Sequence, residues 1–486
     1  MTHDFADRLL RPGDTCWRVE TASKIAVIVD ADDYFRMARA AMSKARRRIV
    51  MVGWDFDARI ELERSESSCE GPMGIAPFVE WLVERNADLD VYLLRWDLGV
   101  LKTLFHGSTI LAIVRWMRRK RIHIKLDGHH PTGASHHQKI VVIDDDIAFC
   151  GGIDMTDGRW DTREHHDNDP RRRLIDGRPY PPWHDATTAL QGPVAAALGE
   201  LCAERWERAG GKPMAKLSIT SDCWPEELVP QFESMSVGIA RTQPPMPGYD
   251  AVVEIERLYI DLIASARTTI YAESQYFASR KIALAIAKRL DEPNGPEVVI
   301  VNPLKARGWL EPIAMDTARG QFVEALRKRD RHDRFRLYHP FTEGGTPIYV
   351  HAKILIIDGR VLRVGSSNMN NRSMRLDTEC DVAIDAAVPH DAQAGDAILA
   401  FRDSLVGEHL GVSEDAVSDA IERTGSLIAA IEALRSPTGR TLRPFEQPDP
   451  SAIELWLSEN EILDPEGPEE MFEVLTRRTL FRGWRD

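Results

Sequence analysis

Short apolar runs alternate with amphipathic stretches along most of the chain, and the series occurs twice. Short apolar runs bounded by turn residues predict buried strands, whereas apolar residues spaced three and four apart predict helices. In the first half this pattern predicts helices over 32–47, 75–85 and 101–119 and strands over 49–56, 91–96 and 122–126. In the second half it predicts helices over 251–267, 281–290 and 315–328 and strands over 269–277, 297–302 and 334–338.

Each series closes with a further apolar run, HQKIVVID at 137–144 and HAKILIID at 351–358. Strands that alternate with helices are typical of α/β units on a mixed, largely parallel sheet. The sequence therefore predicts an α/β fold with two similar α/β lobes, each with helices flanking its own sheet.

Composition and repeat together divide the chain into four segments. Residues 1–209 and 249–410 hold the two copies and are expected to form an N-terminal and a C-terminal lobe. Residues 210–248, rich in Pro and Gly near their end, are expected to be an inter-lobe connection. Residues 411–486 are expected to form a helical and Pro-rich C-terminal extension.

The bulk composition is that of an ordinary globular protein. The 486 residues are 43% hydrophobic and 28% charged, and no apolar run is long enough to span a membrane. The N-terminus lacks a basic region followed by an apolar stretch, so we expect no signal peptide. These features favour a location in the cytoplasm or peripheral to the inner membrane, and leave secretion without a signal open. We expect a monomer, although no feature of the sequence fixes the oligomeric state.

The six cysteines are scattered, without a CxxC pair or Cys/His ligand spacing. We therefore expect free thiols, with no zinc site and no disulfide framework. A net charge of −14 argues against a general nucleic-acid binder, because such proteins are usually basic.

The two closing runs share His at the first position, Lys at the third and Asp at the eighth. On a strand, residues two apart point to the same face, so His137 neighbours Lys139 and His351 neighbours Lys353. Two adjacent cationic groups are costly in an apolar core. They suit a phosphate, whose oxygens attract a cation while its phosphorus accepts a nucleophile. The repetition argues against coincidence.

Small residues and then a polar residue follow each run. Gly151 and Gly152 precede Asp154 in the first half, and Gly365 with its neighbouring serine precedes Asn368 in the second. Glycine at a strand end permits close approach of the backbone or a positive φ. We expect Asp154 and Asn368 to point into a cleft and to bind phosphate or to brace the groups that do.

At this point the chain resembles the phospholipase D superfamily, which is defined by paired His-x-Lys-x4-Asp motifs. GGIDMTDGRWDT at 151–162, PPWHD at 181–185 followed by QGPV, and IYAESQYF at 270–277 are similar to the eukaryotic-type branch and its bacterial relatives. The resemblance covers roughly residues 15–400. It implies two lobes packed with pseudo-twofold symmetry around one active site.

The resemblance also implies a mechanism. One histidine attacks phosphorus and forms a phosphohistidine, and the other protonates the leaving alcohol. By analogy, His137 is the nucleophile and His351 the general acid and base, although the near-symmetry of the site leaves the order open. Lys139 and Lys353 would offset the charge of the transition state, so neither a metal nor another cofactor is expected.

The family usually supplies an acid downstream of each motif to hold the histidine. Asp185 and Glu379 align best with that role here, with Asp377 or Asp381 as the alternatives to the second. The remaining assignments are Arg372 and Ser373 as contacts to the phosphate or its loop, and Asp144 and Asp358 as structural residues at strand ends.

The resulting hypothesis is a phospholipase D. It would hydrolyse the distal phosphodiester of glycerophospholipids in a membrane surface or micelle, giving phosphatidic acid and a headgroup alcohol, with transfer to other alcohols. The alternatives are a phosphatidyltransferase of the cardiolipin or phosphatidylserine synthase kind, a nuclease-type phosphodiesterase, and a lipid-binding scaffold without catalysis. The PWHD and GRWD signatures disfavour the phosphatidyltransferase, and the acidic net charge disfavours the nuclease. The two intact His/Lys pairs disfavour a scaffold without catalysis.

Overall fold

The computed structural model describes residues 8–64, 69–97, 115–116, 118–217, 221–306, 312–387 and 391–446. The helix predicted over 101–119 lies almost entirely outside these residues, and so does the tail beyond 446. Of the remaining predicted helices and strands, all are present, with ends shifted by a few residues.

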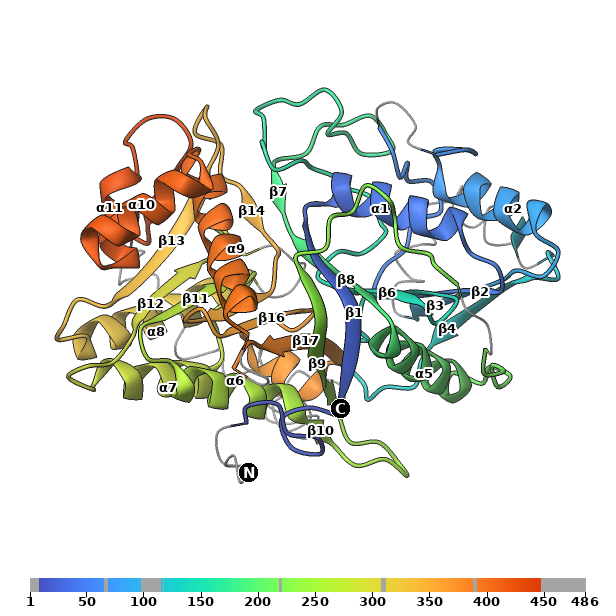
Figure 1. Ribbon diagram of the computed structural model, residues 1–486, viewed down its shortest axis with the longest axis horizontal. Coiled ribbons are helices and arrows are strands. Elements are labelled where there is room, and N and C mark those ends of the chain that lie inside the picture. The colour runs from blue at the N-terminus through green and yellow to red at the C-terminus, as the bar shows by residue number, and fades with distance from the viewer. Residues whose placement is uncertain are drawn as a thin grey trace, which may run out of the picture.

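One mixed sheet of sixteen strands runs through both halves of the molecule (Figure 1). Its first-half strands are β1 (Arg18–Val29), β2 (Arg48–Gly53), β3 (Asp90–Trp96), β4 (Ile122–Asp127), β5 (Ile140–Ile143), β6 (Ile147–Gly151) and β8 (Ala186–Gln191). Its second-half strands are β9 (Phe232–Gln243), β10 (Val252–Val253), β11 (Thr269–Glu273), β12 (Glu297–Val301), β13 (Phe335–Phe341), β15 (Ile354–Ile357), β16 (Val361–Gly365), β17 (Glu379–Asp385) and β18 (Thr441–Pro444).

The strand order repeats outward from the middle of this sheet. It reads β1-β8-β6-β5-β2-β3-β4 on one side and β9-β17-β16-β15-β11-β12-β13 on the other, with β18 added at the second edge. The long strands β1 and β9 pair antiparallel, with Arg18 opposite Ile239 and Ile25 opposite Phe232. The expected two separate sheets are therefore joined into one, because two central strands hydrogen-bond across the boundary between the halves.

The sheet is mixed, as predicted, but parallel pairing is confined to its outer parts. β2, β3 and β4 run parallel, as do β11, β12 and β13, while the other pairs on the main path are antiparallel. The reason is local. β5 and β6 are joined by a tight turn in which Asp144 and Asp145 have positive φ, and such a short connection can only reverse the chain.

The expected connection over 210–248 holds the central strand β9. This corrects that expectation: the strand's inward side chains, such as Val237 and Ile239, are fully buried, so the segment belongs to the core. In the C-terminal segment, β18 pairs antiparallel with β13 and completes that edge of the sheet.

Helices cover both faces of the sheet. They are α1 (Ala31–Ser43), α2 (Ile75–Arg85), α5 (Pro193–Arg208), α6 (Glu254–Ser265), α7 (Arg280–Leu290), α8 (Pro312–Arg329), α9 (Ala392–Leu410), α10 (Glu414–Thr424) and α11 (Leu427–Leu434), with a short π-helix, η2 (Arg372–Leu376).

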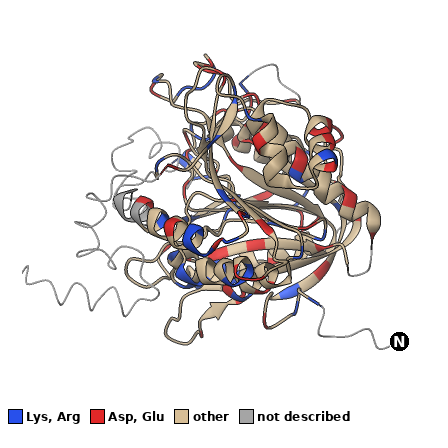
Figure 2. Cartoon of the chain, turned by 90° about the vertical axis from the view of Figure 1, so that its left-hand side faces the viewer, with Lys and Arg blue, Asp and Glu red and all other residues tan. Residues whose placement is uncertain are grey.

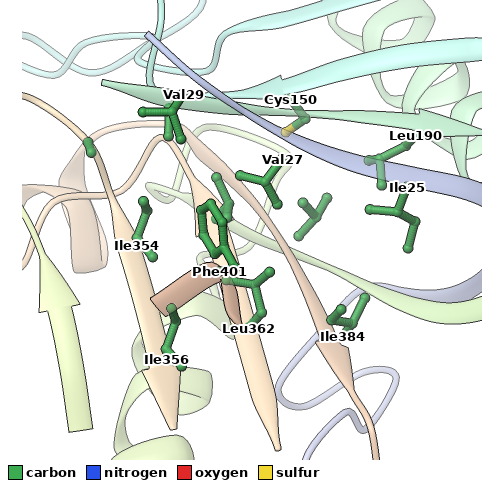
Figure 3. Packing of buried hydrophobic residues seen from close by; sticks show 14 of the residues in the cluster. Ile25, Val27, Val29, Cys150, Leu190, Ile354, Ile356, Leu362, Ile384 and Phe401 are labelled. Carbon is green, nitrogen blue, oxygen red and sulfur yellow. The ribbon is translucent and has the colours of Figure 1, made fainter. Parts of the chain in front are cut away.

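Alternation along β1 shows how the layers form. Ile25, Val27 and Val29 pack with α5 and α9 on one face, where Phe401 joins them (Figure 3). Ala26 and Ile28 pack with α1 and α2 on the other face. Because successive side chains of a strand point to opposite faces, one strand contributes to two cores.

Acidic and basic residues are intermingled on the helices that face the viewer in Figure 2. Within the described residues, none of the helices is both long enough and apolar enough to cross a membrane. All six cysteines are free, as predicted, and five of them are buried.

Candidate active site

The two His-x-Lys segments lie immediately before β5 and β15, which are the third strands outward from the central pair β1 and β9. They were expected within the strands. Their backbones instead bond to the opposite half of the chain: the His137 amide donates to the Thr378 carbonyl at 2.8 Å, and the His351 amide donates to the His184 carbonyl at 2.7 Å. The second contact extends a small parallel sheet of β7 (Trp183–His184) and β14 (Tyr349–Val350). Each histidine is thus placed beside residues from the other half.

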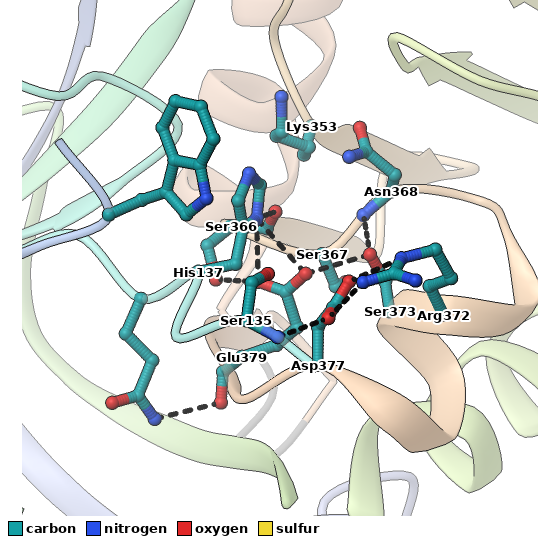
Figure 4. Close-up of polar contacts among 12 residues, drawn as sticks. Ser135, His137, Lys353, Ser366, Ser367, Asn368, Arg372, Ser373, Asp377 and Glu379 are labelled. Atoms are coloured by element: carbon teal, nitrogen blue, oxygen red, sulfur yellow. Dashed lines mark hydrogen bonds and ion pairs between the residues drawn. The ribbon is translucent and has the colours of Figure 1, made fainter. Parts of the chain in front are cut away.

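His137 is held by a carboxyl group from the second half (Figure 4). Its Nδ1 lies 3.0 Å from both oxygens of Glu379 and 3.1 Å from the Ser366 carbonyl oxygen. Ser366 and Ser373 donate hydroxyl hydrogen bonds to the same carboxyl group. These contacts fix the ring, and they leave Nε2 as the nitrogen available for chemistry.

His351 is held by a carboxylate from the first half. Its Nδ1 lies 2.6 Å from Asp185 Oδ2, and both side chains are buried. The His351 ring also lies against Trp183, at 5.1 Å between ring centroids, and Trp183 stacks on Tyr349 at 4.6 Å. The arrangement matches that of His137 with the two halves exchanged.

The two lysines bring positive charge to the same place. Lys139 Nζ lies 3.1 Å from Asp154 Oδ2 and donates to the His137 carbonyl, while Lys353 donates to the His351 carbonyl. Lys353 is fully buried. Burial, assisted by the nearby Lys139 charge, lowers the pKa of Lys353 to about 7 despite the opposing effect of Asp185. Lys139 and Lys353 are two buried cationic side chains, and burial destabilises the charged form of Lys353. Such a pair would bind an anion favourably.

Burial and the lysine charges also favour the neutral form of the two imidazoles while no anion is bound. Burial, then Lys139 and Lys353, hold the pKa of His137 well below its usual range. Burial and Lys353 do the same for His351 against the pull of Asp185. A neutral imidazole whose Nδ1 faces a carboxyl group presents an unprotonated Nε2.

The two carboxyl groups differ in their electrostatics. Burial disfavours a charge on Asp185, but the contacts with His351 and Lys353 outweigh it and lower the pKa of Asp185 to about 2. Burial raises the pKa of Glu379 well above its usual range, although Ser366 and Lys139 oppose the shift. The carboxylate beside His351 is therefore the better partner for an imidazolium.

The four residues predicted to contact phosphate occupy different positions. Asp154 pairs with Lys139 and accepts from the Trp54 amide at 3.1 Å, so it braces the lysine. Ser373 donates to Glu379 and accepts from the Asn368 amide, so it braces the carboxyl group. A carboxylate would repel a phosphate, and the Ser373 hydroxyl is already engaged. The contacts of Asp154 and Ser373 are those of the bracing alternative that was predicted beside direct contact with phosphate.

Arg372 is likewise engaged elsewhere: its guanidinium contacts Asp377 at 2.9 Å and the Gly133 carbonyl at 2.8 Å. It ties η2 to the loop before His137, which is the loop-bracing alternative predicted for it. Asn368 differs from the other three, since its buried Oδ1 has no hydrogen-bond partner among the described residues. Its side chain is drawn beside Lys353 in Figure 4.

Glycine is needed at the three predicted positions because other atoms lie very close to the backbone there. A Cβ on Gly152 would lie 2.2 Å from Asp185 Oδ1, and one on Gly151 would lie 2.3 Å from the Thr187 Cα. A Cβ on Gly365 would lie 2.0 Å from Asp381 Oδ1. Neither Asp377 nor Asp381 contacts His137 directly; Asp381 instead pairs with Arg363.

Asp144 and Asp358 have the contacts of structural residues. The Asp144 carboxylate accepts from the amides of residues 46, 47 and 48, and the Asp358 carboxylate accepts from those of residues 267, 268 and 269. Each therefore caps the loop that leads into the neighbouring strand, β2 or β11.

Ser366 and Tyr349 contribute contacts that the sequence did not single out. Ser366 contacts the Glu379 carboxyl group, and the Tyr349 hydroxyl accepts from Gln275 at 2.8 Å. Ser366 follows Gly365 directly, and that position was the available signal. A separate set of buried donors brings His184 of β7 together with Asp30, His165 and Glu408.

Comparison with known proteins gives matches in both halves. The family model described as "Phospholipase D" matches residues 41–242, and that described as "Cardiolipin synthase, PLD-like domain" matches residues 259–395. Phospholipase D alpha 1 of Carica papaya is 25% identical over 77% of this chain, and that of Arabidopsis thaliana is 25% identical over 78%. The chain spans 63% and 64% of the length of these relatives.

Among solved structures, the phosphatidylserine synthase of Haemophilus influenzae Rd KW20 has a similar fold, with a TM-score of 0.54. The similarity covers 90% of this chain and 93% of that one at 13% sequence identity. At that identity the likeness concerns the fold.

Proposed function

Because this chain belongs to the phospholipase D superfamily, whose members act on phosphodiesters, we propose that it is a phospholipase D. It hydrolyses the distal phosphodiester of glycerophospholipids to phosphatidic acid and a headgroup alcohol. The observation that carries the proposal is the exchanged pairing: Glu379 holds His137 and Asp185 holds His351, with two lysines beside them.

His137 is proposed as the nucleophile. Its Nδ1 faces Glu379, so the Nε2 lone pair attacks phosphorus, the P–N bond forms, and the bond from phosphorus to the headgroup oxygen breaks. The anionic phosphodiester offsets the lysine charge that disfavours protonation, so His351 takes up a proton at Nε2 as the substrate binds. It then gives this proton to the departing alkoxide, so the headgroup leaves as a neutral alcohol. The charged Asp185 stabilises the imidazolium that must exist before this transfer.

The second step reverses these roles. The now neutral His351 removes a proton from water, the oxygen attacks the phosphohistidine, and the P–N bond breaks to release phosphatidic acid and free His137. An alcohol that enters in place of water would yield a new phospholipid. One pair of histidines thus supports hydrolysis and transphosphatidylation.

Lys139 and Lys353 are proposed to bind the non-bridging oxygens of the phosphate. Their buried ammonium groups lack the solvation that water would provide, so the phosphodiester monoanion gains a strong interaction on entering, and the transition state, with more charge on its non-bridging oxygens, gains a stronger one. Asn368, with an unpaired amide atom at the same place, is the further candidate for contact with the phosphate.

The partner is proposed to be a phospholipid surface or micelle, approached by a monomer acting peripherally from the cytoplasm, with secretion without a signal as the other location. A phosphatidyltransferase is the second candidate, favoured by the match of residues 259–395 to the cardiolipin synthase model. The same two-step chemistry serves it, with a lipid alcohol as acceptor. The net charge of −14 disfavours a nuclease.

One assay separates these activities. The full chain is incubated without added metal with phosphatidylcholine, with phosphatidylglycerol, or with single-stranded DNA, each with and without ethanol. Phosphatidic acid from phosphatidylcholine, and phosphatidylethanol when ethanol is present, support the proposal. Cardiolipin made from phosphatidylglycerol without phosphatidic acid would favour the transferase, and cleavage of DNA alone would refute both.

A further inference from the structure

A second cluster of chemically active side chains lies outside the candidate active site. Asp30, His165, His184 and Glu408 come from four separate parts of the chain, and their donor atoms all lie within 4.8 Å of one another. All four residues are buried. The mechanism above assigns none of them a role, and carboxylates and imidazoles so deeply buried require a compensating partner.

The two histidines are oriented by carboxylates behind them. His165 Nδ1 lies 3.0 Å from Asp161 Oδ2, and His184 Nε2 lies 2.7 Å from Glu273 Oε2. A carboxylate behind an imidazole holds the proton on that nitrogen and leaves the opposite nitrogen with a lone pair. His165 Nε2, which contacts Glu408 Oε1 at 3.2 Å, and His184 Nδ1 both face the space between Asp30 and Glu408, and each presents a lone pair there when its imidazole is neutral.

The carboxylates are oriented in the same way. Asp30 Oδ1 accepts from the Asp185 amide at 3.0 Å, while Oδ2 is buried and has no hydrogen-bond partner among the described residues. Glu408 Oε2 is bound by Arg163, and its Oε1 faces the two histidines. Each carboxylate thus has one oxygen fixed and one turned inward.

The spacing of the inward atoms fits a tetrahedral ion. His184 Nδ1 and Glu408 Oε1 are 2.8 Å apart, His165 Nε2 and Glu408 Oε1 3.2 Å, and His165 Nε2 and Asp30 Oδ2 3.5 Å. Ligand atoms at the usual zinc distances of about 2.0–2.1 Å would be separated by about 3.3 Å around a tetrahedron.

We propose that Asp30, His165, His184 and Glu408 bind a divalent transition-metal ion of the Zn²⁺ class in a closed structural site. Imidazole nitrogen with carboxylate oxygen is a donor set that Zn²⁺ accepts, and four protein ligands leave no position for substrate. None of the four residues belongs to the His/Lys pairs, so the ion would take no part in the bonds that form and break in the proposed phosphohistidine chemistry.

The alternative is a pair of imidazolium ions. Burial opposes protonation of His165, but Asp30 and Asp161 outweigh it and raise its pKa to about 9 in the absence of an ion. A protonated His184 would direct an Nδ1–H bond at an acceptor. His184 Nδ1 makes no such bond with any described residue, although Glu408 Oε1 lies 2.8 Å away. His165 Nε2 does hydrogen-bond to Glu408 Oε1 at 3.2 Å, so the imidazolium alternative accounts for His165. It leaves His184 Nδ1 close to an acceptor without an aligned bond, and this contact favours coordination.

The position of the cluster gives a bound ion a structural role. The chain enters β7 beside it, His184 precedes Asp185, and Asp30 bonds to the Asp185 amide and donates its own amide to the Asp185 carbonyl at 2.8 Å. Glu408 belongs to α9, near the end of the second half. A bound ion would therefore join α9 to β7 and would fix the position of Asp185, the partner of His351.

The test measures metal directly on the full chain. We would determine the metal content of the wild type, His165→Gln and a matched control, His339→Gln, after purification in buffers containing Zn²⁺ and dialysis. His339 is another buried histidine, bonded to the Asn302 carbonyl and not one of the four cluster residues. The expected result is about one Zn²⁺ per chain for the wild type and the control, and loss of this ion in His165→Gln.

A second measurement covers the case in which His165→Gln does not fold. Wild type stripped with a strong chelator is titrated with Co²⁺, and a tetrahedral site gives intense visible absorption that saturates at about one equivalent. Wild type that contains no metal and takes up neither Zn²⁺ nor Co²⁺ would overturn the proposal in favour of paired imidazolium ions. None of these readouts uses phospholipid turnover, so the outcome is independent of the proposed activity.

Discussion

Asp185 Oδ2 lies 2.6 Å from His351 Nδ1, although the two residues belong to opposite halves of the repeat. Glu379 and His137 make the reciprocal contact at 3.0 Å. Neither half therefore contains a complete histidine and carboxyl pair. The proposed active site therefore requires both halves, and each half supplies the carboxyl group that contacts the other half's histidine.

Removing the charge of Asp185 should reduce catalysis without unfolding the chain. In Asp185→Asn the amide keeps the size of the side chain but no longer stabilises imidazolium on His351, so we expect kcat to fall by roughly 10²–10⁴-fold. Steady-state kinetics on phosphatidylcholine would measure this, with His339→Gln as the control for a buried polar substitution. An Asp185→Asn variant with wild-type kcat would refute the role of the pair.

The order of the two histidines can be tested with a substrate that needs no acid. A phosphatidyl ester of nitrophenol leaves without protonation, so His351→Asn should release a burst of nitrophenolate and then stall at the phosphohistidine. His137→Asn should show no burst, because it lacks the nucleophile. The reverse pattern would exchange the two roles, while His351→Asn with full turnover of phosphatidylcholine would contradict the paired site.

The lowered pKa of Lys353 in the folded protein predicts how the free energy of unfolding depends on pH. Its pKa is about 7 in the folded protein against a usual value of 10.5, so between these pH values the unfolded chain binds more protons than the folded one. The contribution of Lys353 to the free energy of unfolding therefore becomes more favourable as pH rises from 7 to 10.5. Urea unfolding of the wild type and Lys353→Met across this range measures it.

In that comparison the wild type should gain stability relative to Lys353→Met as pH rises, and below pH 7 the variant should be the more stable. A constant difference between the two across the range would contradict the burial argument. In the wild type, kcat/KM should fall above about pH 7, as the free enzyme loses the ammonium that attracts phosphate.

Asp144 and Asp358 allow the same substitution to be compared at a buried and at a more exposed site. Both have φ of 53°, and each accepts three backbone amides, so replacement by Ala imposes the same backbone strain at both sites. Asp144 is the more buried. We expect Asp144→Ala to cost roughly 2–4 kcal/mol of unfolding free energy, and Asp358→Ala about 1–2, because water reaches the amides at the second site.

Equal losses in the two variants would show that burial does not decide the cost. A loss of kcat in Asp358→Ala at unchanged stability would instead give that aspartate a catalytic role. Urea unfolding and steady-state kinetics on the same preparations distinguish these outcomes.

The sequence by itself determined the local parts of this protein. Apolar runs such as 297–302 predicted strands, and amphipathic stretches such as 75–85 predicted helices, because the period of burial depends on local geometry. The repetition of His, Lys and Asp at fixed spacing singled out both motifs. Motif resemblance then selected Asp185 and Glu379.

The tertiary structure alone decided how these parts combine. That β1 and β9 pair across the halves, that Asp154 holds Lys139, and that Asp30, His165, His184 and Glu408 converge depends on contacts between residues far apart in the chain. Spacing along a sequence carries no record of such contacts. The physical reason is that the alternation of apolar residues along a strand indicates which face is buried, but does not indicate which other element covers that face.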